Sequence, residues 1–326
     1  PEDIEGMNLS KAVITIRGGM TSHAAVVARG MGIPCVSGCE NLIINEKDRT
    51  ITYDGKAITS NDYISVDGTS GTVYLGNIPT HDAVIEDYFK EFMTYVTNNM
   101  SVGVRANADN ERDAMMAFKL GAKGIGLCRT EHMFFDEERI FNFRKMILAK
   151  DKKDREKALE KILPYQRDDF YHLFKVMDGF PVTIRLLDPP LHEFLPKTSA
   201  EIKELADSLN LNVSVINDRI SELKEFNPMM GHRGCRLAIT YPEIAETQTK
   251  AVIGAAINTQ RKHPDWNVVP EIMIPLVGDV KELKFVKDIV VKTAQEMIAR
   301  SDIKLSYHVG TMIEIPRAAI LAGEIA

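Results

Sequence analysis

The stretch GGMTSHAAVVARGMG, residues 18–32, decides how the first part of this chain folds. Thr21 and Ser22 are both suitable N-cap residues, and the small apolar residues after them favour a helix that ends near Gly30. His23 then falls in the first helical turn, where unpaired backbone N–H groups and the positive end of the helix dipole favour an anion. Its imidazole is a nitrogen nucleophile near neutral pH. The pattern predicts a histidine that carries a phosphoryl group; the alternative is a capped surface helix with an incidental histidine.

Residues 1–80 are predicted to form a small α/β domain. Its expected elements are a strand, a helix and three further β-prone runs that Asp-Gly turns separate. They lie at 12–16, 23–29, 51–53, 63–66 and 72–75. Breaks at Gly76 and Pro79 then end this pattern, and residues 82–97 indicate a helical connector. We therefore expect a domain boundary near residue 80 and a helical linker over 81–99.

From residue 100 the pattern changes to strands separated by long helices, which is typical of βα units around a parallel sheet. Six strand candidates lie at 102–106, 123–128, 182–187, 233–237, 269–275 and 307–315. Helical patterns lie between them at 114–120, 156–177, 244–261 and 280–300. These elements fit a partial (β/α)8 barrel of the TIM type over 100–326. An open doubly wound sheet is the alternative that periodicity leaves open.

Composition restricts the partners that this chain can have. Its 326 residues include 40 Lys and Arg and 46 Asp and Glu, a net charge of −6, which argues against nucleic acid or an anionic membrane as the main partner. No apolar run approaches the ~20 residues of a membrane helix, and no signal peptide precedes the first strand. The cysteines lack zinc-like pairs and the density of a disulfide scaffold, so we expect free thiols in a reducing compartment such as the cytoplasm. They are Cys35, Cys39, Cys128 and Cys235.

A second group of candidate residues lies where the strands of such a barrel would end. Arg129, Arg185 and Arg233 lie at or near strand candidates, and the carboxyl ends of barrel strands carry the chemistry. The planar fork of arginine binds carboxylate and phosphate oxygens through two hydrogen bonds. Glu314, near the end of the last strand candidate, suits Mg²⁺, which takes oxygen ligands and often shares them with a phosphorylated substrate. For each arginine the alternative is an ordinary ion pair.

Five strings of sequence together resemble the phosphoenolpyruvate-utilising enzymes. They are residues 18–32, GIGLCRTEHMFF at 124–135, IRLLDPPLHEFLP at 184–196, NPMMGHRGCRL at 227–237 and GTMIEIPRAA at 310–319. The resemblance implies a small swivelling phosphohistidine domain followed by a barrel that binds phosphoenolpyruvate or pyruvate. It implies that His23 is the phosphorylated catalytic residue and that Glu314 binds substrate and Mg²⁺. The phosphate and carboxylate of phosphoenolpyruvate would be bound by Arg129, Arg185 and Arg233.

Within this family the strings resemble the dikinase branch, which interconverts ATP, phosphate and pyruvate with AMP, pyrophosphate and phosphoenolpyruvate. The resemblance implies that His23 is loaded at a nucleotide domain and that the small domain then swings to the barrel. Thr21 matches a threonine that regulatory phosphorylation targets in plant relatives. A homodimer is implied by the resemblance alone.

Several parts of such an enzyme are missing between Pro1 and Ala326. The nucleotide-binding domain, a second acidic Mg²⁺ ligand and a catalytic cysteine have no counterpart, so we expect a fragment that is inactive alone. Phosphoenolpyruvate synthase and enzyme I of the sugar phosphotransferase system are the nearest alternatives. Met20, where both usually carry arginine, and the string at 188–194 favour the dikinase branch. Further alternatives are a non-catalytic phosphocarrier module and a barrel lyase acting on a 2-oxo acid.

Overall fold

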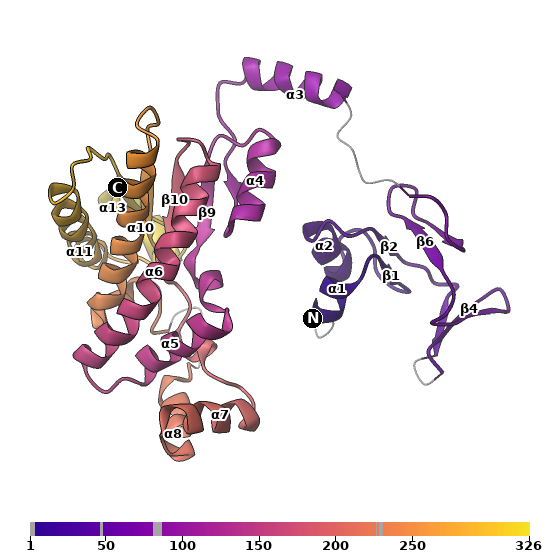
Figure 1. The fold of residues 1–326 in the computed structure, drawn as a ribbon, viewed down its shortest axis with the longest axis horizontal. Coiled ribbons are helices and arrows are strands. Elements are labelled where there is room, and N and C mark those ends of the chain that lie inside the picture. Colours follow the sequence, from indigo (N-terminus) through magenta and orange to yellow (C-terminus); the bar gives the residue numbers. More distant parts are fainter. Residues whose placement is uncertain (1–3, 46–47, 81–86, 226, 228–230) are drawn as a thin grey trace. The chain divides into compact units, whose positions relative to one another are not determined.

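The structure is a computed structural model that divides by its packing into two units, residues 1–86 and 87–326. Each unit is described by itself (Figure 1). The described residues are 4–45, 48–80, 87–225, 227 and 231–326. Within these ranges no helix combines the length and the apolar character that crossing a bilayer requires.

The smaller unit is built from short elements. They are α1 (Ile4–Leu9), β1 (Val13–Thr15), α2 (His23–Gly30), β2 (Cys35–Ser37), β3 (Ile43–Asn45), β4 (Thr50–Tyr53), β5 (Lys56–Ile58), β6 (Ile64–Asp67) and β7 (Thr72–Leu75). Strands β1 and β2 pair in parallel, whereas β3-β4-β5 and β6-β7 form antiparallel sheets. Asp54 and Gly55 both have positive φ at the β4–β5 turn, as a tight hairpin requires. The five elements predicted here are confirmed, each end within one residue.

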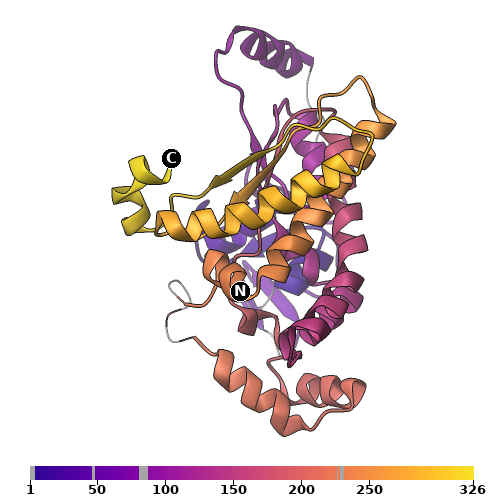
Figure 2. The ribbon, with the colours of Figure 1, turned by 90° about the vertical axis from the view of Figure 1, so that its left-hand side faces the viewer.

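The larger unit alternates strands and helices. Its strands are β8 (Ala106–Asn107), β9 (Ile125–Arg129), β10 (Val182–Arg185), β11 (Pro270–Ile274) and β12 (His308–Thr311). Its helices are α3 (Asp87–Asn99), α4 (Glu111–Lys119), η1 (Thr130–Phe134), α5 (Glu137–Leu148), α6 (Lys152–Val176), η2 (Leu191–Phe194), α7 (Ser199–Leu209), α8 (Val213–Leu223), α9 (Gly234–Thr240), α10 (Pro242–Lys262), α11 (Val280–Ala299), α12 (Pro316–Ile320) and α13 (Ala322–Ile325). Helix α10 packs against both α6 and α11 (Figure 2).

The five strands form one parallel sheet in the order β8-β9-β10-β11-β12. Each strand therefore pairs with the strand that follows it along the chain. A doubly wound sheet reverses its strand order at a switch point, and the described strands show no such reversal. The fold is a mixed α/β chain whose larger unit is a partial barrel of the TIM type, so the prediction of a barrel is confirmed and the open-sheet alternative is wrong.

The two faces of the sheet differ in chemistry. Val182 and Ile184 of β10 are fully buried in the main hydrophobic cluster, with Phe170 of α6. Side chains alternate along a strand, so Thr183 and Arg185 lie on the opposite, polar face. The Thr183 hydroxyl donates to Glu271 of β11 at 2.5 Å. The apolar face therefore carries the packing, and the polar face is free to carry chemistry.

The strand predicted at 233–237 is wrong, because these residues lie at the start of helix α9. Cys235 and Leu237 are buried there, and a short apolar run fits a buried helix as well as a buried strand. Gly234 has a φ of +57°, and a Cβ at this position would lie 2.7 Å from Cβ of Leu276. A contact with a residue distant in the sequence therefore restricts this position to glycine.

Two other strand predictions were too long, and one prediction lies partly outside the described residues. Of 102–106, only Ala106 is in β8, and Val104 is 63% exposed. Of 307–315, the strand β12 stops at Thr311, whose hydroxyl donates to the Ile274 carbonyl at 2.7 Å. Residues 82–86 of the predicted connector lie outside the described residues, and α3 follows from Asp87.

Candidate phosphoryl-transfer site

His23 is the first residue of α2 and is exposed. Ser22 is the N-cap, with extended backbone and a hydroxyl that accepts the Ala25 N–H at 3.4 Å. Thr21, the other cap candidate, is exposed and does not cap the helix. The imidazole therefore stands at the helix end where backbone N–H groups and the dipole favour an anion, as predicted.

The loop before His23 is held at two points. Arg29, in the last turn of α2, donates from Nη2 to the Met20 carbonyl at 3.1 Å. Gly18 has a φ of +103°, and a Cβ on Gly38 would approach the Gly18 carbonyl oxygen to 3.0 Å. A side chain at either glycine would shift the loop, so these contacts fix how His23 is presented.

In the larger unit, Arg129 and Arg185 are the last residues of β9 and β10 and are paired in register. The Arg129 N–H donates to Asp109 Oδ1 at 2.6 Å, and its Nη1 lies 3.5 Å from Asp109 Oδ2. The Arg129 side chain keeps 36% of its surface exposed, whereas that of Arg185 keeps 10%. Two guanidinium groups therefore stand side by side at the carboxyl ends of neighbouring strands.

Asp188 joins Arg185 to Arg233. Its Oδ2 lies 3.1 Å from Nη1 of Arg185 and 2.6 Å from Nη2 of Arg233, and Nε of Arg233 donates to Oδ1 at 3.2 Å. Asp188 is 2% exposed. A carboxylate buried between two guanidinium groups fixes both forks.

Glu131 completes this frame by an ion pair with Nη2 of Arg185. Within the described residues, Oε2 of Glu131 and Nε of Arg185 are buried without a hydrogen-bond partner. Buried polar atoms are almost always paired, so these orphaned atoms indicate a place that a ligand completes. Sequence reasoning missed Glu131 and Asp188. The signals that could have found them are an acid two residues after Arg129 and an acid three residues after Arg185.

Glu314 lies beyond the end of β12 and is exposed. Its Oε1 accepts the Leu276 N–H at 2.7 Å, which holds the carboxylate beside the end of β11. Across the described part of the chain, no group of three or more His, Cys, Asp and Glu side chains is arranged to hold a metal. The side chain of Glu314 thus offers one ordered carboxylate as a metal ligand. It fits Mg²⁺ only where substrate oxygens and water supply the other ligands, which is how this ion usually binds.

The two cysteines of the larger unit are packing residues. Cys128 and Cys235 are fully buried. Burial raises the pKa of Cys128 well above its ordinary value and that of Cys235 to about 12. Both thiols therefore stay protonated near neutral pH and do not suit proton transfer.

Both units of the chain are similar to domains of known proteins. Residues 85–326 match the PEP-binding domain of PEP-utilising enzymes, and residues 1–71 match the mobile domain of these enzymes. The chain belongs to the PEP-utilising enzyme family, which confirms the resemblance found in its sequence.

Proteins similar to this chain include several pyruvate, phosphate dikinases. The whole chain is 52% identical over 326 residues to that of Clostridium symbiosum and 50% identical over 327 residues to that of Rhizobium meliloti (strain 1021). It is 46% identical over 331 residues to the chloroplastic protein of Mesembryanthemum crystallinum. The chain spans 37%, 36% and 34% of the lengths of these proteins, respectively.

Proposed function

We propose that this chain is part of a phosphotransferase that interconverts ATP, phosphate and pyruvate with AMP, pyrophosphate and phosphoenolpyruvate, with His23 as the phosphoryl carrier. The observation that supports it most is the pair of strand-end arginines, Arg129 and Arg185. Nε of Arg185 has no hydrogen-bond partner among the described residues. The names of the relatives support the same reaction.

The barrel arginines supply binding and charge neutralisation. Arg129, Arg185 and Arg233 bind the phosphate and carboxylate of phosphoenolpyruvate. In the reverse direction they stabilise the enolate oxygen of pyruvate that attacks phosphorus. Phosphoryl transfer is mostly positioning and electrostatic stabilisation, and donors fixed in advance by Asp188 and Glu131 need no reorganisation as charge develops.

The domains divide this work. Residues 1–80 are the phosphohistidine domain, 81–99 the linker, and 100–326 the substrate-binding barrel. His23 accepts a phosphoryl group at a nucleotide site on another part of the protein, where ATP, phosphate, AMP and pyrophosphate bind. The small domain then swings to the barrel. The exposure of His23 supports a role at more than one site.

Mg²⁺ is the cofactor of this proposal, and Glu314 is its protein ligand. When bound, the ion would neutralise phosphate and enolate oxygens as a Lewis acid. The ordered, exposed carboxylate of Glu314 supports this assignment.

Three further features belong to the proposal. Thr21 is a candidate regulatory phosphosite, and its exposure supports access by a kinase. A cytoplasmic location is supported by four free cysteines, which are typical of reducing compartments. A homodimer is expected from the resemblance.

The test is transfer of labelled phosphate from phosphoenolpyruvate to the full-length protein with Mg²⁺. We expect acid-labile label in the native protein and in the control His172→Ala, and none in His23→Ala. Label that persists in His23→Ala would remove this residue from the mechanism. Discharge of the label by AMP and pyrophosphate separates a dikinase from phosphoenolpyruvate synthase, enzyme I and a phosphocarrier module.

A further inference from the structure

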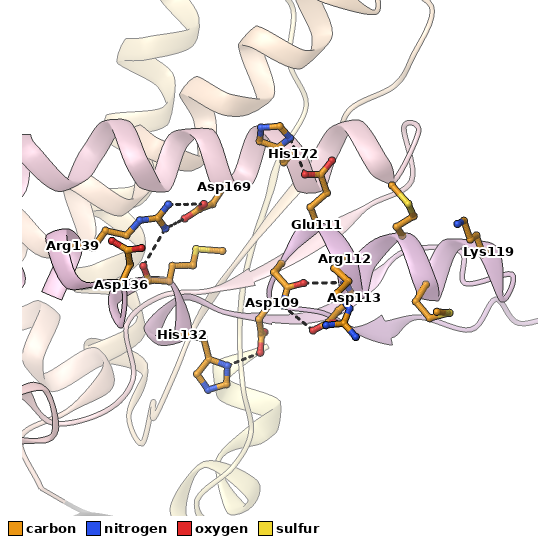
Figure 3. Close-up of a pocket in the computed structure, with 14 residues that line it drawn as sticks. Asp109, Glu111, Arg112, Asp113, Lys119, His132, Asp136, Arg139, Asp169 and His172 are labelled. Carbon is orange, nitrogen blue, oxygen red and sulfur yellow. Dashed lines mark hydrogen bonds and ion pairs between the residues drawn. The ribbon is translucent and has the colours of Figure 1, made fainter. Parts of the chain in front are cut away.

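A histidine that the proposed mechanism does not use lies beside the strand-end arginines. His132 belongs to η1, three residues after Arg129, and its side chain is 53% exposed. Its Nδ1 is 2.7 Å from Oδ2 of Asp109 (Figure 3). Because η1 continues β9 and Asp109 follows β8, the pair stands at the carboxyl ends of two neighbouring strands.

Asp109 ties this histidine to Arg129. The Asp109 side chain is 14% exposed; its Oδ1 accepts the Arg129 N–H at 2.6 Å, and its Oδ2 faces both His132 and Nη1 of Arg129. An ionised carboxylate can only accept hydrogen bonds, so Nδ1 of His132 carries a proton. The contact therefore orients the ring and leaves Nε2 as the nitrogen available to a ligand.

We infer that His132 is a further substrate-contact residue of the barrel, whose Nε2 donates to a phosphoryl oxygen beside Arg129, with Asp109 as its positioning residue. This rests on the proposed binding of phosphoenolpyruvate. In the bound state the ring is an imidazolium, with Asp109 on one nitrogen and the phosphoryl anion on the other. Charge-assisted hydrogen bonds of this kind are among the stronger ones.

A second histidine, which is only partly exposed, provides the contrast. Nδ1 of His172, on α6, pairs with Glu111 of α4 at 3.2 Å. Both histidines line a cavity of about 870 Å³ along α4 (Figure 3). His172, however, lies on a helix beside the sheet, whereas His132 follows a strand end. Both histidines contact a carboxylate. His132 also lies at the carboxyl end of a strand, which the inferred phosphoryl contact requires, whereas His172 does not.

The experiment measures binding of phosphoenolpyruvate and of pyruvate to the full-length protein carrying His23→Ala, which prevents transfer. Further changes are His132→Asn, His132→Gln and the control His172→Asn. Asparagine can reproduce the Nδ1 contact with Asp109 but has no group at Nε2, whereas glutamine reaches the Nε2 position. We expect His132→Asn to weaken phosphoenolpyruvate binding about tenfold and His132→Gln to weaken it less.

Pyruvate separates a phosphoryl contact from a general disturbance, because it lacks the phosphoryl group. We expect pyruvate affinity to be unchanged in His132→Asn, and both affinities to be unchanged in His172→Asn. Asp109→Asn is expected to weaken phosphoenolpyruvate more than pyruvate. Equal loss of both ligands, or no loss of phosphoenolpyruvate in His132→Asn, would overturn the inference. If His23→Ala alone binds no phosphoenolpyruvate, the proposed function itself fails.

Discussion

His23 lies exposed on an eight-residue helix of the smaller unit, whereas Arg185 lies almost fully buried at the end of a strand in the larger unit. The buried apolar residues described in the smaller unit are Ala25, Ala28 and Val36, while the larger unit contains extended hydrophobic clusters. A carrier must present its nucleophile to other sites, and a binding site must exclude water around fixed charges. The contrast fits the two different tasks that we propose for these residues.

Thiol reactivity gives the largest expected difference between the units. Cys35 and Cys39 are partly accessible, and Cys128 and Cys235 are fully buried. Because buried thiols react only when their unit opens, we expect them to be modified at least about 1,000-fold more slowly. Peptide mapping after timed exposure to a thiol reagent at pH 8 measures this. Burial raises the pKa of Cys35, so its rate should rise with pH. Equal modification rates for all four cysteines would contradict the expected difference between the two units.

Removal of a core side chain should destabilise the larger unit alone. Phe170 is fully buried on α6, and Phe170→Ala is expected to lower the free energy of unfolding by about 4 kcal/mol through lost burial and a cavity. Fluorescence of Trp266, the single tryptophan, reports unfolding of this unit. Val36→Ala, in the smaller unit, is the control and should leave the Trp266 transition in place. A shift of similar size in the control would show that the units unfold together.

The cap of α2 gives a smaller effect, which is confined to this helix. Ser22→Ala removes the hydroxyl that accepts the Ala25 N–H and should cost about 1 kcal/mol. Faster hydrogen exchange of the amides in α2 would report this loss. Thr21→Ala is the matched control, because Thr21 precedes the cap. If Thr21→Ala accelerates exchange as strongly, the assignment of the cap is wrong.

The smallest expected effect is acid sensitivity at the β6–β7 turn. Ser70 Oγ donates to Asp67 at 2.6 Å, and the Thr69 N–H donates at 2.9 Å; these bonds lower the pKa of Asp67 below 3.8. A lowered folded-state pKa stabilises the fold above pH 3.8, and this contribution is lost as pH falls through the folded pKa. Titration by NMR should show the pKa rising toward 3.8 in Ser70→Ala. An unchanged pKa would assign the shift to another cause.

Local signals explain which parts of the fold and site the sequence predicts. The helix at His23 depends on a cap within one residue of it, and the turn at Asp54 on two residues that accept positive φ. Arg129 and Arg185 could be placed because both end strands of clear apolar pattern. In each case the deciding residues are neighbours along the chain.

Contacts between distant residues explain what the sequence does not predict. Residues 234–240 form a helix, and its first residue, Gly234, lies too close to Leu276 for a side chain. The partner of Arg185, Glu131, comes from the neighbouring strand end, 54 positions away. Neither contact leaves a periodic pattern in the sequence, so both can be identified only when the fold places these residues beside each other.

The sequential strand order of the larger unit bears on how the chain folds during synthesis. Each strand from β8 to β12 pairs with its successor, so the sheet can grow from its first edge in the order in which the ribosome releases it. In the described sheet, each new strand adds to the edge that the preceding strand forms, so none of them has to insert between two strands that are already paired. Pairings between consecutive βα units also shorten the loops that folding must close.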